Sequence, residues 1–509
     1  MGDLEEIRRQ LPKTGLSGGI ALYGPLLLAL YFVATARWGS YLLPGPPYIG
    51  DLALGGLIAH RVWLLWRGNA PKPLLSRWIA IPTILLLVLS VVELATGELS
   101  ITALRDAAPY FYASLVLLGQ SYRAIPDRLL EGLAYGSLIF LALWYEAVYL
   151  FPSIAQQVWT FGDETVFLFQ PRGDFDGALI GVLAVLALDR IVNGRTPASS
   201  ALVAAGALVV VLSNQSRSAL LAVICAFGLL GVRYIVLWRA GRRPEPTPSG
   251  LGPLDRLGAK ANPLMAVMVM VIVPIGIFAT SGPPEALKRS VNVVKNVDEQ
   301  DTQREADDKP KAGGTGKTTA FYGSNSGVGT FTARAKGWRA AVEWLHEGSP
   351  GRAVFGTGFG PHYMQLSGAD VLLLGEFADP EVRPIHNFAI NTWARLGIVG
   401  LLALLFVAVP AIVAAFRLSW RSWQPPPLDL FAGLLVIAIP VTALVGVVLE
   451  TPFGAIPYFW AVGYLGARMV EEGLWKPLSL PARLARSRAS YEKPTPTPTP
   501  TPTAGSDPA

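Results

Sequence analysis

The stretch RPIHNFAINTWARLGIVGLL, residues 383–402, places a histidine and an asparagine directly before a long apolar run. His386 is one of only four histidines in the chain. Imidazole is the side chain whose ordinary pKa lies nearest neutrality, so a histidine is well suited to take a proton from a hydroxyl group. His386 is therefore a candidate general base, with Asn387 beside it as a supporting polar group.

Arginines accompany this pair in the sequence. Arg172 lies in QPRGDFDG, Arg217 lies in SNQSRSALL between Ser216 and Ser218, and Arg395 lies inside the apolar run. A guanidinium group binds phosphate oxygens through two parallel hydrogen bonds, so converging arginines favour an anionic ligand such as a diphosphate. The alternative for each arginine is a structural one, in which the side chain extends from a helix end toward the lipid headgroups.

Headgroup contact explains Arg395 less easily than the other arginines. At about 1.5 Å per helical residue, Arg395 should lie about 13 Å deeper in the span than His386. A charge inside a membrane span is costly unless it faces a polar cavity or a partner, so an intramembrane arginine indicates a functional site. We therefore expect Arg395 to face a polar cavity and to contact the anion.

The composition indicates which elements must position these residues. Of the 509 residues, 52% are hydrophobic and only 15% are charged, which is far more apolar than a soluble domain. The excess of Lys and Arg over acids is therefore interpreted as a topology signal and not as nucleic-acid binding. The single cysteine, Cys225, excludes an intramolecular disulfide and a cysteine-based metal site.

The predicted fold class is an all-α, polytopic integral membrane protein with about twelve transmembrane helices, because a bilayer core about 30 Å thick needs roughly 20 apolar residues per helix. The first span lacks a convincing small-residue cleavage site, so we expect it to stay in the mature protein. The expected spans are residues 15–36, 46–66, 78–96, 104–120, 129–151, 175–193, 198–213, 217–238, 262–280, 386–416, 427–449 and 453–471.

Basic residues predict which side of the membrane each loop faces, because Lys and Arg gather in short cytoplasmic loops. With a cytoplasmic N-terminus, most Lys and Arg of the short loops are cytoplasmic, and only Arg37, Arg105, Arg172 and Arg217 lie outside. The expected location is the cell (inner or plasma) membrane, with both termini cytoplasmic. His386 then belongs to the extracytoplasmic side.

Four parts of the chain follow from this topology. Residues 1–280 form an N-terminal bundle of about nine helices, 281–384 form an extracytoplasmic loop, 385–471 form about three C-terminal helices, and 472–509 form a disordered Pro/Thr-rich tail. Within the loop, apolar residues recur at helical spacing and predict an amphipathic helix near 332–347, lying on or near the membrane.

Three further patterns carry weaker signals. GGTGKTT, residues 313–319, lacks the glycine that a phosphate-binding loop needs five positions before its Gly-Lys pair, so we expect no nucleotide site there. FGTGFG, residues 355–360, is either a flexible turn or a backbone that approaches a polar ligand closely. His60, His346 and His362 have no partner at metal-ligand spacing, and we expect no metal and no cofactor.

The HN pair at 386–387, followed by G-I-V-G at 397–400, resembles the signature of the O-antigen ligase superfamily, which also includes Wzy-type polymerases. Other marks are similar: the SRS around Arg217, the Arg-Gly pair at Arg172, the lead-in TARAKGWRAAVEW before FGTGFG, and a long outer loop before the signature. The resemblance covers roughly residues 165–450.

The resemblance implies a metal-independent, inverting glycosyl transfer outside the cytoplasm. The donor would be a glycan on a polyprenyl diphosphate carrier, and the acceptor a hydroxyl of a lipid or a glycan. Carried over by residue, Arg217 binds the donor diphosphate, with Arg334 or Arg339 as a second phosphate contact, and His386 acts on the acceptor hydroxyl. Such arginines would stabilise the charge that grows on the leaving group.

We add Arg172 and Arg395 to the candidate donor site because of their positions in the predicted topology, and not because of the resemblance. Gly397 and Gly400 would present a smooth helix surface where another helix can pack closely. The sequence leaves ligase and cell-surface polysaccharide polymerase both open, as well as the oligomeric state. Two alternatives are a lipid-linked sugar transporter or flippase, for which no internal repeat is evident, and a non-catalytic membrane scaffold that uses its tail.

Overall fold

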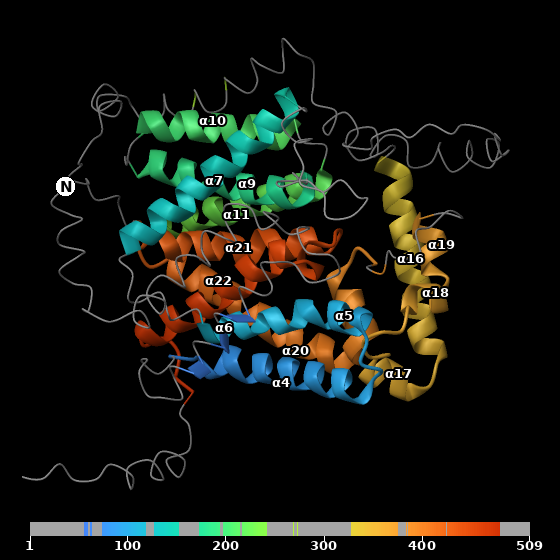
Figure 1. The fold of residues 1–509 in the computed structure, drawn as a ribbon. Helices are drawn as coiled ribbons and strands as arrows, with labels where there is room; N and C mark the ends of the chain where they lie inside the picture. Colours follow the sequence, from blue (N-terminus) through green and yellow to red (C-terminus); the bar gives the residue numbers. More distant parts are fainter. Residues whose placement is uncertain are drawn as a thin grey trace, which may run out of the picture.

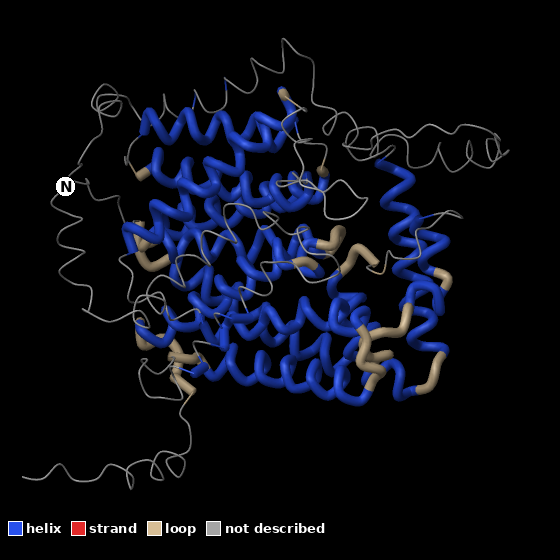
Figure 2. The backbone as a smooth tube through the Cα atoms, in the orientation of Figure 1, coloured by secondary structure: helices blue, strands red, loops and turns tan. Residues whose placement is uncertain are grey.

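The computed structural model is helical throughout the part of the chain that it describes (Figure 2). That part comprises residues 74–118, 127–151, 173–193, 197–213, 216–241, 327–374, 383, 385–423 and 425–478, with a few isolated positions between 55 and 63 and at 268 and 272. The expected spans at 15–36, 46–66 and 262–280, and the predicted tail beyond residue 478, therefore lie outside the described residues, apart from those positions.

The described helices, labelled in Figure 1, follow the chain in this order: α4 (Arg77–Thr96), α5 (Ile101–Phe111), η1 (Tyr112–Ser114), α6 (Leu115–Leu118), α7 (Asp127–Leu150), α9 (Gly173–Val192), α10 (Pro197–Ser213), α11 (Arg217–Arg239), α16 (Gly327–Glu347), α17 (Pro350–Phe355), α18 (Tyr363–Ser367), α19 (Ala369–Leu374), α20 (Phe388–Ser419), α21 (Pro427–Ala443), η3 (Val448–Glu450) and α22 (Pro452–Glu471).

Three of these helices are long and apolar enough to cross a membrane: Arg77–Thr96, Ser218–Arg239 and Phe388–Ser419. Shorter apolar helices include Ala198–Leu212 and Leu428–Ala443. The all-helical membrane fold expected from the composition is therefore observed in the described residues. The count of about twelve spans stays a prediction.

The described ends of the expected spans lie within three residues of their predicted positions, except in two segments. In the span expected at 427–449, α21 ends at Ala443 and the 3₁₀ turn η3 follows at Val448–Glu450. The segment 104–120 differs, because α5 gives way to the 3₁₀ turn η1 and the short α6. Pro109 lies inside α5 and cannot donate a backbone hydrogen bond, which weakens the helix locally. The hydroxyl of Ser114 donates to the Phe111 carbonyl oxygen at 2.7 Å within the break.

The predicted amphipathic helix is α16, and its apolar side packs on protein. Ala341 and Leu345 are fully buried and join a cluster with Tyr363 and Met364 of α18 and with Ala369 of α19. Burial of this apolar side stabilises the packing of α16, α18 and α19 in one layer.

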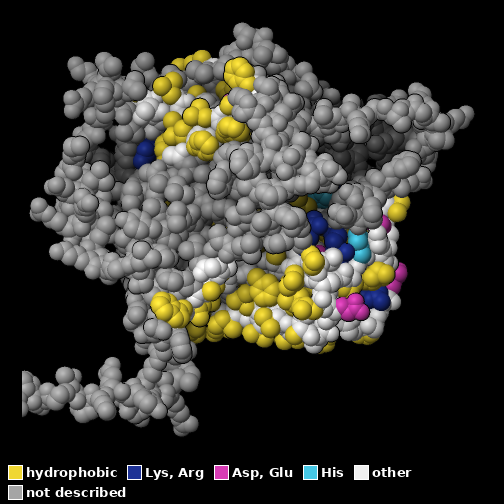
Figure 3. Space-filling model, in the orientation of Figure 1, with side chains coloured by type: hydrophobic (Ala, Val, Ile, Leu, Met, Phe, Trp, Pro, Cys, Tyr) yellow, Lys and Arg dark blue, Asp and Glu magenta, His cyan; other side chains and the backbone are white. Residues whose placement is uncertain are grey.

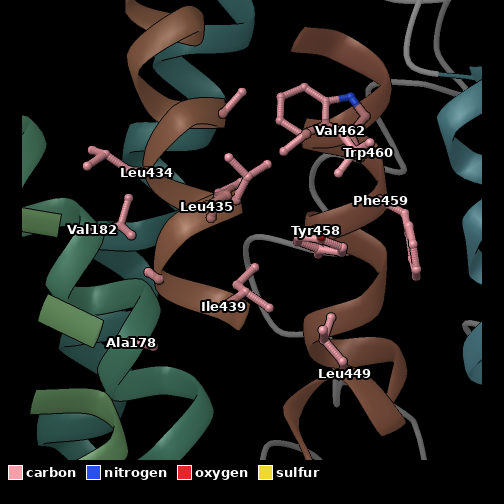
Figure 4. Packing of buried hydrophobic residues seen from close by; sticks show 14 of the residues in the cluster. Ala178, Val182, Leu434, Leu435, Ile439, Leu449, Tyr458, Phe459, Trp460 and Val462 are labelled. Carbon is pink, nitrogen blue, oxygen red and sulfur yellow. The ribbon is translucent and has the colours of Figure 1, made fainter. Parts of the chain in front are cut away.

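The long helices lie side by side in a bundle, and the layer of α16–α19 lies across one end of it (Figure 1). α21 and α22 occupy the middle of the bundle. α21 packs against α9 on one side and against α22 on the other. Figure 4 shows Leu434 of α21 near Val182 of α9, and Ile439 of α21 on the side toward Tyr458 of α22. This dry core fixes the relative positions of the helix ends that carry the polar residues.

The two ends of the bundle can be told apart by contacts between α11 and α20. Arg233, near the end of α11, donates to the carbonyl oxygen of Ser419, the last residue of α20, at 2.9 Å. The two helices therefore run in the same direction and begin at the same end. We call that end, where α16–α19 lie, the site end, and the opposite one the far end.

α20 is divided by a break at Gly397. This glycine has φ 66° and ψ −173° inside a helix of 32 residues. Such a helix would measure about 48 Å unbroken, well beyond a bilayer core of about 30 Å. The part after the break is long enough to span, and the residues before it form an arm, 388–396, that enters the α16–α19 layer.

The break corrects the depth expected for Arg395. A Cβ at Gly97, where α4 ends, would lie 3.5 Å from the carbonyl oxygen of Phe359. Phe359 belongs to the loop that contacts Arg395, so Arg395 is level with the end of a full-length span, not about 13 Å inside one. Sequence spacing gave the wrong depth because it assumed that the span starts at His386.

The surface is consistent with this division. Figure 3 shows a continuous hydrophobic band over the face that α4 covers, and charged side chains gathered toward the α16–α19 end. The exposed apolar residues of α4 include Ile81, Leu85, Val88 and Val92. An apolar face of this kind fits contact with lipid.

Candidate active site

His386 lies at the start of the α20 arm, in an unusual backbone conformation. Its φ is 58°, and it is the one non-glycine residue with positive φ among the described residues. The next residue, Asn387, is the N-cap of α20, and its Oδ1 accepts hydrogen bonds from the backbone N–H groups of Ala389 and Ile390, both at 3.1 Å. This cap turns the chain sharply and leaves His386 half-buried just outside the helix.

Two arginines on either side of His386 converge on one carboxylate. Asp106 of α5 accepts from Arg383 through both of its oxygens, at 3.1 and 2.8 Å, and it pairs with the Nη2 of Arg395 at 2.9 Å. The side chains of Asp106 and Arg395 are 7% and 2% exposed, so this ion cluster is shielded from solvent. Shielded charges of this kind hold their geometry firmly.

The glycine-rich segment 355–360 lies against the break in α20. The backbone N–H groups of Thr357 and Gly358 donate to the carbonyl oxygens of Ala394 and Arg395, at 2.8 and 3.0 Å. Gly356 has φ 82°, and a Cβ there would lie 2.4 Å from the Arg395 carbonyl oxygen. The segment therefore approaches another backbone closely, and its partner in the structure is α20. The approach to a polar ligand that the sequence offered as one interpretation of FGTGFG stays a prediction.

Arginine side chains bind further carbonyl oxygens of this segment and of its neighbour Pro361. Arg395 donates to the carbonyl oxygen of Pro361 at 2.6 Å, and Arg383 donates to those of Gly360 and Pro361. The backbone N–H of Gly360 donates in turn to Asp106 at 3.2 Å. Irregular backbone at a membrane boundary requires such partners, which gives Arg395 a role in positioning the loop.

Hydroxyl groups connect this cluster to the arm. Tyr363 donates to the Oδ1 of Asn391 at 2.8 Å, and Tyr110 donates to the hydroxyl of Thr392 at 3.3 Å. The guanidinium of Arg395 lies 4.9 Å from the centre of the Tyr363 ring. These buried contacts fix the rotation of the arm and hence the direction in which its first residues face.

One face of α16 reaches the same place. The indole N–H of Trp338 donates to the carbonyl oxygen of Ile385, the residue before His386, at 2.9 Å. Arg334, one helical turn earlier on that face, donates to the carbonyl oxygen of Val445 beyond α21. Arg339 is 81% exposed and pairs with Glu343. Of the two arginines that the resemblance offered, Arg334 is the better placed.

Glu450 places a carboxyl group near the ion cluster. It ends η3, in the turn between α21 and α22. The residue is half-buried, but both carboxylate oxygens are inaccessible to solvent and have no hydrogen-bond partner among the described residues. Burial raises the pKa of Glu450 to about 8, an effect that Arg395 opposes and Asp106 reinforces. The carboxyl group is therefore mostly protonated at neutral pH.

The structure brings some predicted residues together and leaves others undescribed. Arg217 is the first residue of α11, at the site end, and its side chain lies outside the described part. Ser216 caps that helix by accepting from the Ala219 N–H, and its hydroxyl lies 2.9 Å from that of Ser218. Arg172 lies outside the described residues.

The surroundings of the two glycines in the G-x-x-G pattern differ from the smooth packing surface that the sequence predicted. A Cβ at Gly397 would lie 2.0 Å from the Val354 carbonyl oxygen of α17, and a Cβ at Gly400 would lie 2.2 Å from the Leu396 Cβ of the same helix. Gly397 therefore permits the break and the close approach of α17. Gly400 lies where the turn after the break is tight.

Sequence reasoning missed Asp106, Arg383, Tyr363 and Glu450. Asp106 is an acidic residue inside the predicted span 104–120, and Glu450 directly follows the predicted span 427–449. Both positions were usable signals, but the partners of these residues are remote in the chain. Within the described part, no three of His, Cys, Asp and Glu gather as a metal site would require.

Fold and site together define an integral membrane protein with a half-buried histidine at one end of a helical bundle, flanked in the sequence by two arginines that bind Asp106. Residues 201–405 match the O-antigen ligase family model, which supports the assignment to the O-antigen ligase superfamily that the motif at 386–400 predicted. The family comprises membrane enzymes of the ligase and polymerase type. No curated protein matches the chain.

Proposed function

We propose that this protein transfers a glycan from a polyprenyl diphosphate carrier to an acceptor hydroxyl at the extracytoplasmic face of the cell membrane. The observation that carries the proposal is the position of His386 in the chain between Arg383 and Arg395, which both bind Asp106 at the site end, inside the segment that matches the family. A base beside cationic groups suits a reaction that frees a hydroxyl proton and expels a diphosphate.

In the proposed reaction the acceptor oxygen attacks the anomeric carbon of the donor. The bond from that carbon to the diphosphate oxygen breaks, its electron pair leaves with the diphosphate, and the hydroxyl proton passes to His386. Because the Nδ1 of His386 is inaccessible to solvent, we assign the acceptor contact to Nε2. Attack opposite the leaving group inverts the configuration of the sugar.

Arg217 and Arg334 are the proposed donor contacts, because each belongs to the site end and to the matched segment. Arg172 stays in the proposal on its sequence position before α9. For Arg395 the contacts with Asp106 and Pro361 favour positioning over direct phosphate binding. The proposed transfer needs no metal and no cofactor.

The proposed orientation rests on the distribution of basic residues. Helices begin or end at the far end with Arg77, Arg190, Arg239, Arg417 and Arg468. Lys and Arg concentrate on the cytoplasmic side of short loops, so we assign the far end and both termini to the cytoplasm. His386 is then extracytoplasmic, where lipid-linked glycans are transferred in the proposed scheme.

Replacement of His386 by asparagine tests the assignment of the base. Asparagine tolerates positive φ nearly as well as any non-glycine residue, so His386→Asn should keep the fold. We expect the transfer rate, measured with the purified chain and a lipid-linked donor, to fall by at least about 100-fold. His362→Asn is the matched control, because asparagine also serves as the N-cap that His362 provides to α18. Near-normal transfer by His386→Asn would remove the base from the mechanism.

A polymerase that adds repeat units to a growing glycan is the second candidate, because it uses the same donor and differs only in the acceptor. A transporter of lipid-linked sugars is favoured by one observation, the break in α20, since transporters use discontinuous helices. In this chain, however, the broken backbone bonds to the glycine-rich segment. Transfer without net movement of the carrier would reject the transporter.

A further inference from the structure

The two end residues of the segment from Arg383 to Arg395 bind the same side chain, that of Asp106. Asp106 binds Arg383 at 2.8 Å and Arg395 at 2.9 Å, and His386 lies between the two arginines. Asp106 comes from α5, outside the matched segment 201–405. The N-terminal half of the molecule thus supplies the anchor for a histidine that the C-terminal half carries.

The contacts restrict the segment in more than one direction. Arg383 approaches both carboxylate oxygens of Asp106, which fixes its plane, and Arg395 adds a second cation on the same carboxylate. The Gly360 N–H also donates to Asp106, at 3.2 Å. The carboxylate therefore ties together the start of the arm, its interior and the glycine-rich segment packed on its break.

The cluster contains more cations than anions. Two guanidinium groups share one carboxylate, so the cluster keeps a net positive charge although it is shielded from solvent. A shielded excess charge costs stability unless it serves another purpose. Stabilising a diphosphate that leaves beside His386 is such a purpose. Asp106 would then set how much of this charge is compensated and where it lies.

We propose that Asp106 is the positioning residue of the site, which fixes His386 for glycosyl transfer by holding Arg383 and Arg395 on either side of it. This inference rests on the proposed function. Misplacing a catalytic group by about 1 Å lowers the rate of the chemical step about 100-fold with little change in ground-state binding. The effect of Asp106 should therefore appear in kcat and not in the donor KM.

The test compares Asp106→Asn and Asp106→Glu with Asp429→Asn in the full chain. Asp429 is a matched control, since it is buried, pairs with Arg468 at 3.0 Å and lies at the far end. We expect Asp106→Asn to lower kcat by about 10- to 100-fold with the donor KM changed less than about threefold. Asp106→Glu keeps the charge, so it should restore much of the rate. Asp429→Asn should lower the unfolding temperature and leave kcat near wild type.

Three outcomes would overturn the inference: wild-type kcat in Asp106→Asn, an equal loss of kcat in Asp429→Asn, or no recovery in a folded Asp106→Glu variant. If His386→Asn is inactive while Asp106→Asn is fully active, the proposed function stands and only the inference fails. If the wild-type chain transfers no glycan, the proposed function fails. The rate at which diethyl pyrocarbonate modifies His386, compared with exposed His346 by mass spectrometry, then still tests the anchoring. Equal His386 rates in wild type and Asp106→Asn would overturn it.

Discussion

At the scale of single residues, the site depends on side chains that stabilise an unusual backbone conformation. His386 has a positive φ, a conformation that costs about 1–3 kcal/mol at a non-glycine residue. The Asn387 cap and the indole of Trp338, which binds the carbonyl of Ile385, offset that cost. Strain that surrounding contacts maintain is typical of functional positions. The sequence showed the histidine, but not the conformation in which it is held.

Glu450 should make stability depend on pH. Its pKa is about 8 in the folded protein and near 4.5 in an unfolded chain, so the folded state binds a proton that the unfolded state lacks between these values. Stability should therefore fall as pH rises from about 4.5 to about 8. Glu450→Gln should match the unfolding temperature of the wild type near pH 5 and exceed it near pH 9. A temperature difference that is the same at both pH values would contradict the raised pKa.

Substitutions of Arg334 and Arg339, both in α16, distinguish a residue that contacts the site from an exposed charged residue. Arg334 lies over the turn after α21, whereas Arg339 is exposed and paired with Glu343. We expect Arg334→Ala to raise the donor KM by at least about tenfold, as the loss of one charged hydrogen bond does. Arg339→Ala should change it less than about threefold. Equal effects of the two substitutions would show that α16 acts only through its overall charge.

At the scale of elements, α20 shows both the success and the limit of sequence reasoning. Its apolar length and its polar start at Asn387 predicted a helix at nearly the observed position. The break at Gly397 was not predicted, because a glycine in a helical pattern does not reveal that α17 will pack against it. The depth of Arg395 was wrong for the same reason. Asp106 was missed because its partners lie far along the chain, and helix periodicity carries no information on such pairs.

Gly397→Ala tests the role of the break. Alanine is strained at φ 66°, and its Cβ would collide with the Val354 carbonyl. We expect a loss of about 2–4 kcal/mol in stability, together with a loss of transfer, measured by thermal unfolding and by activity in detergent. The control is Gly206→Ala in α10, where a Cβ meets nothing within 4 Å. That change should be neutral or stabilise by up to about 1 kcal/mol. A fully stable Gly397→Ala would show that α20 tolerates a continuous helix there.

At the scale of the whole molecule, the two ends of the bundle differ in chemistry. Far-end ion pairs, such as Arg233 with Asp189 and Arg468 with Asp429, join helices that the core already packs together. The site end instead carries His386 and the Asp106 cluster beneath the layer of α16–α19. The composition predicted the membrane fold, and the helical spacing of apolar residues predicted the amphipathic helix. Neither could predict that this layer would close over the arm, because that depends on which helices become neighbours.

The most direct measurement follows the fate of the donor when the purified chain is supplied with a polyprenyl diphosphate-linked glycan and a hydroxyl acceptor. We expect release of free polyprenyl diphosphate in equal amount to the glycosylated product, with the anomeric configuration inverted and the rate unchanged by a metal chelator. Retention of configuration, or movement of the intact donor across a vesicle membrane without release of the diphosphate, would contradict the proposed function.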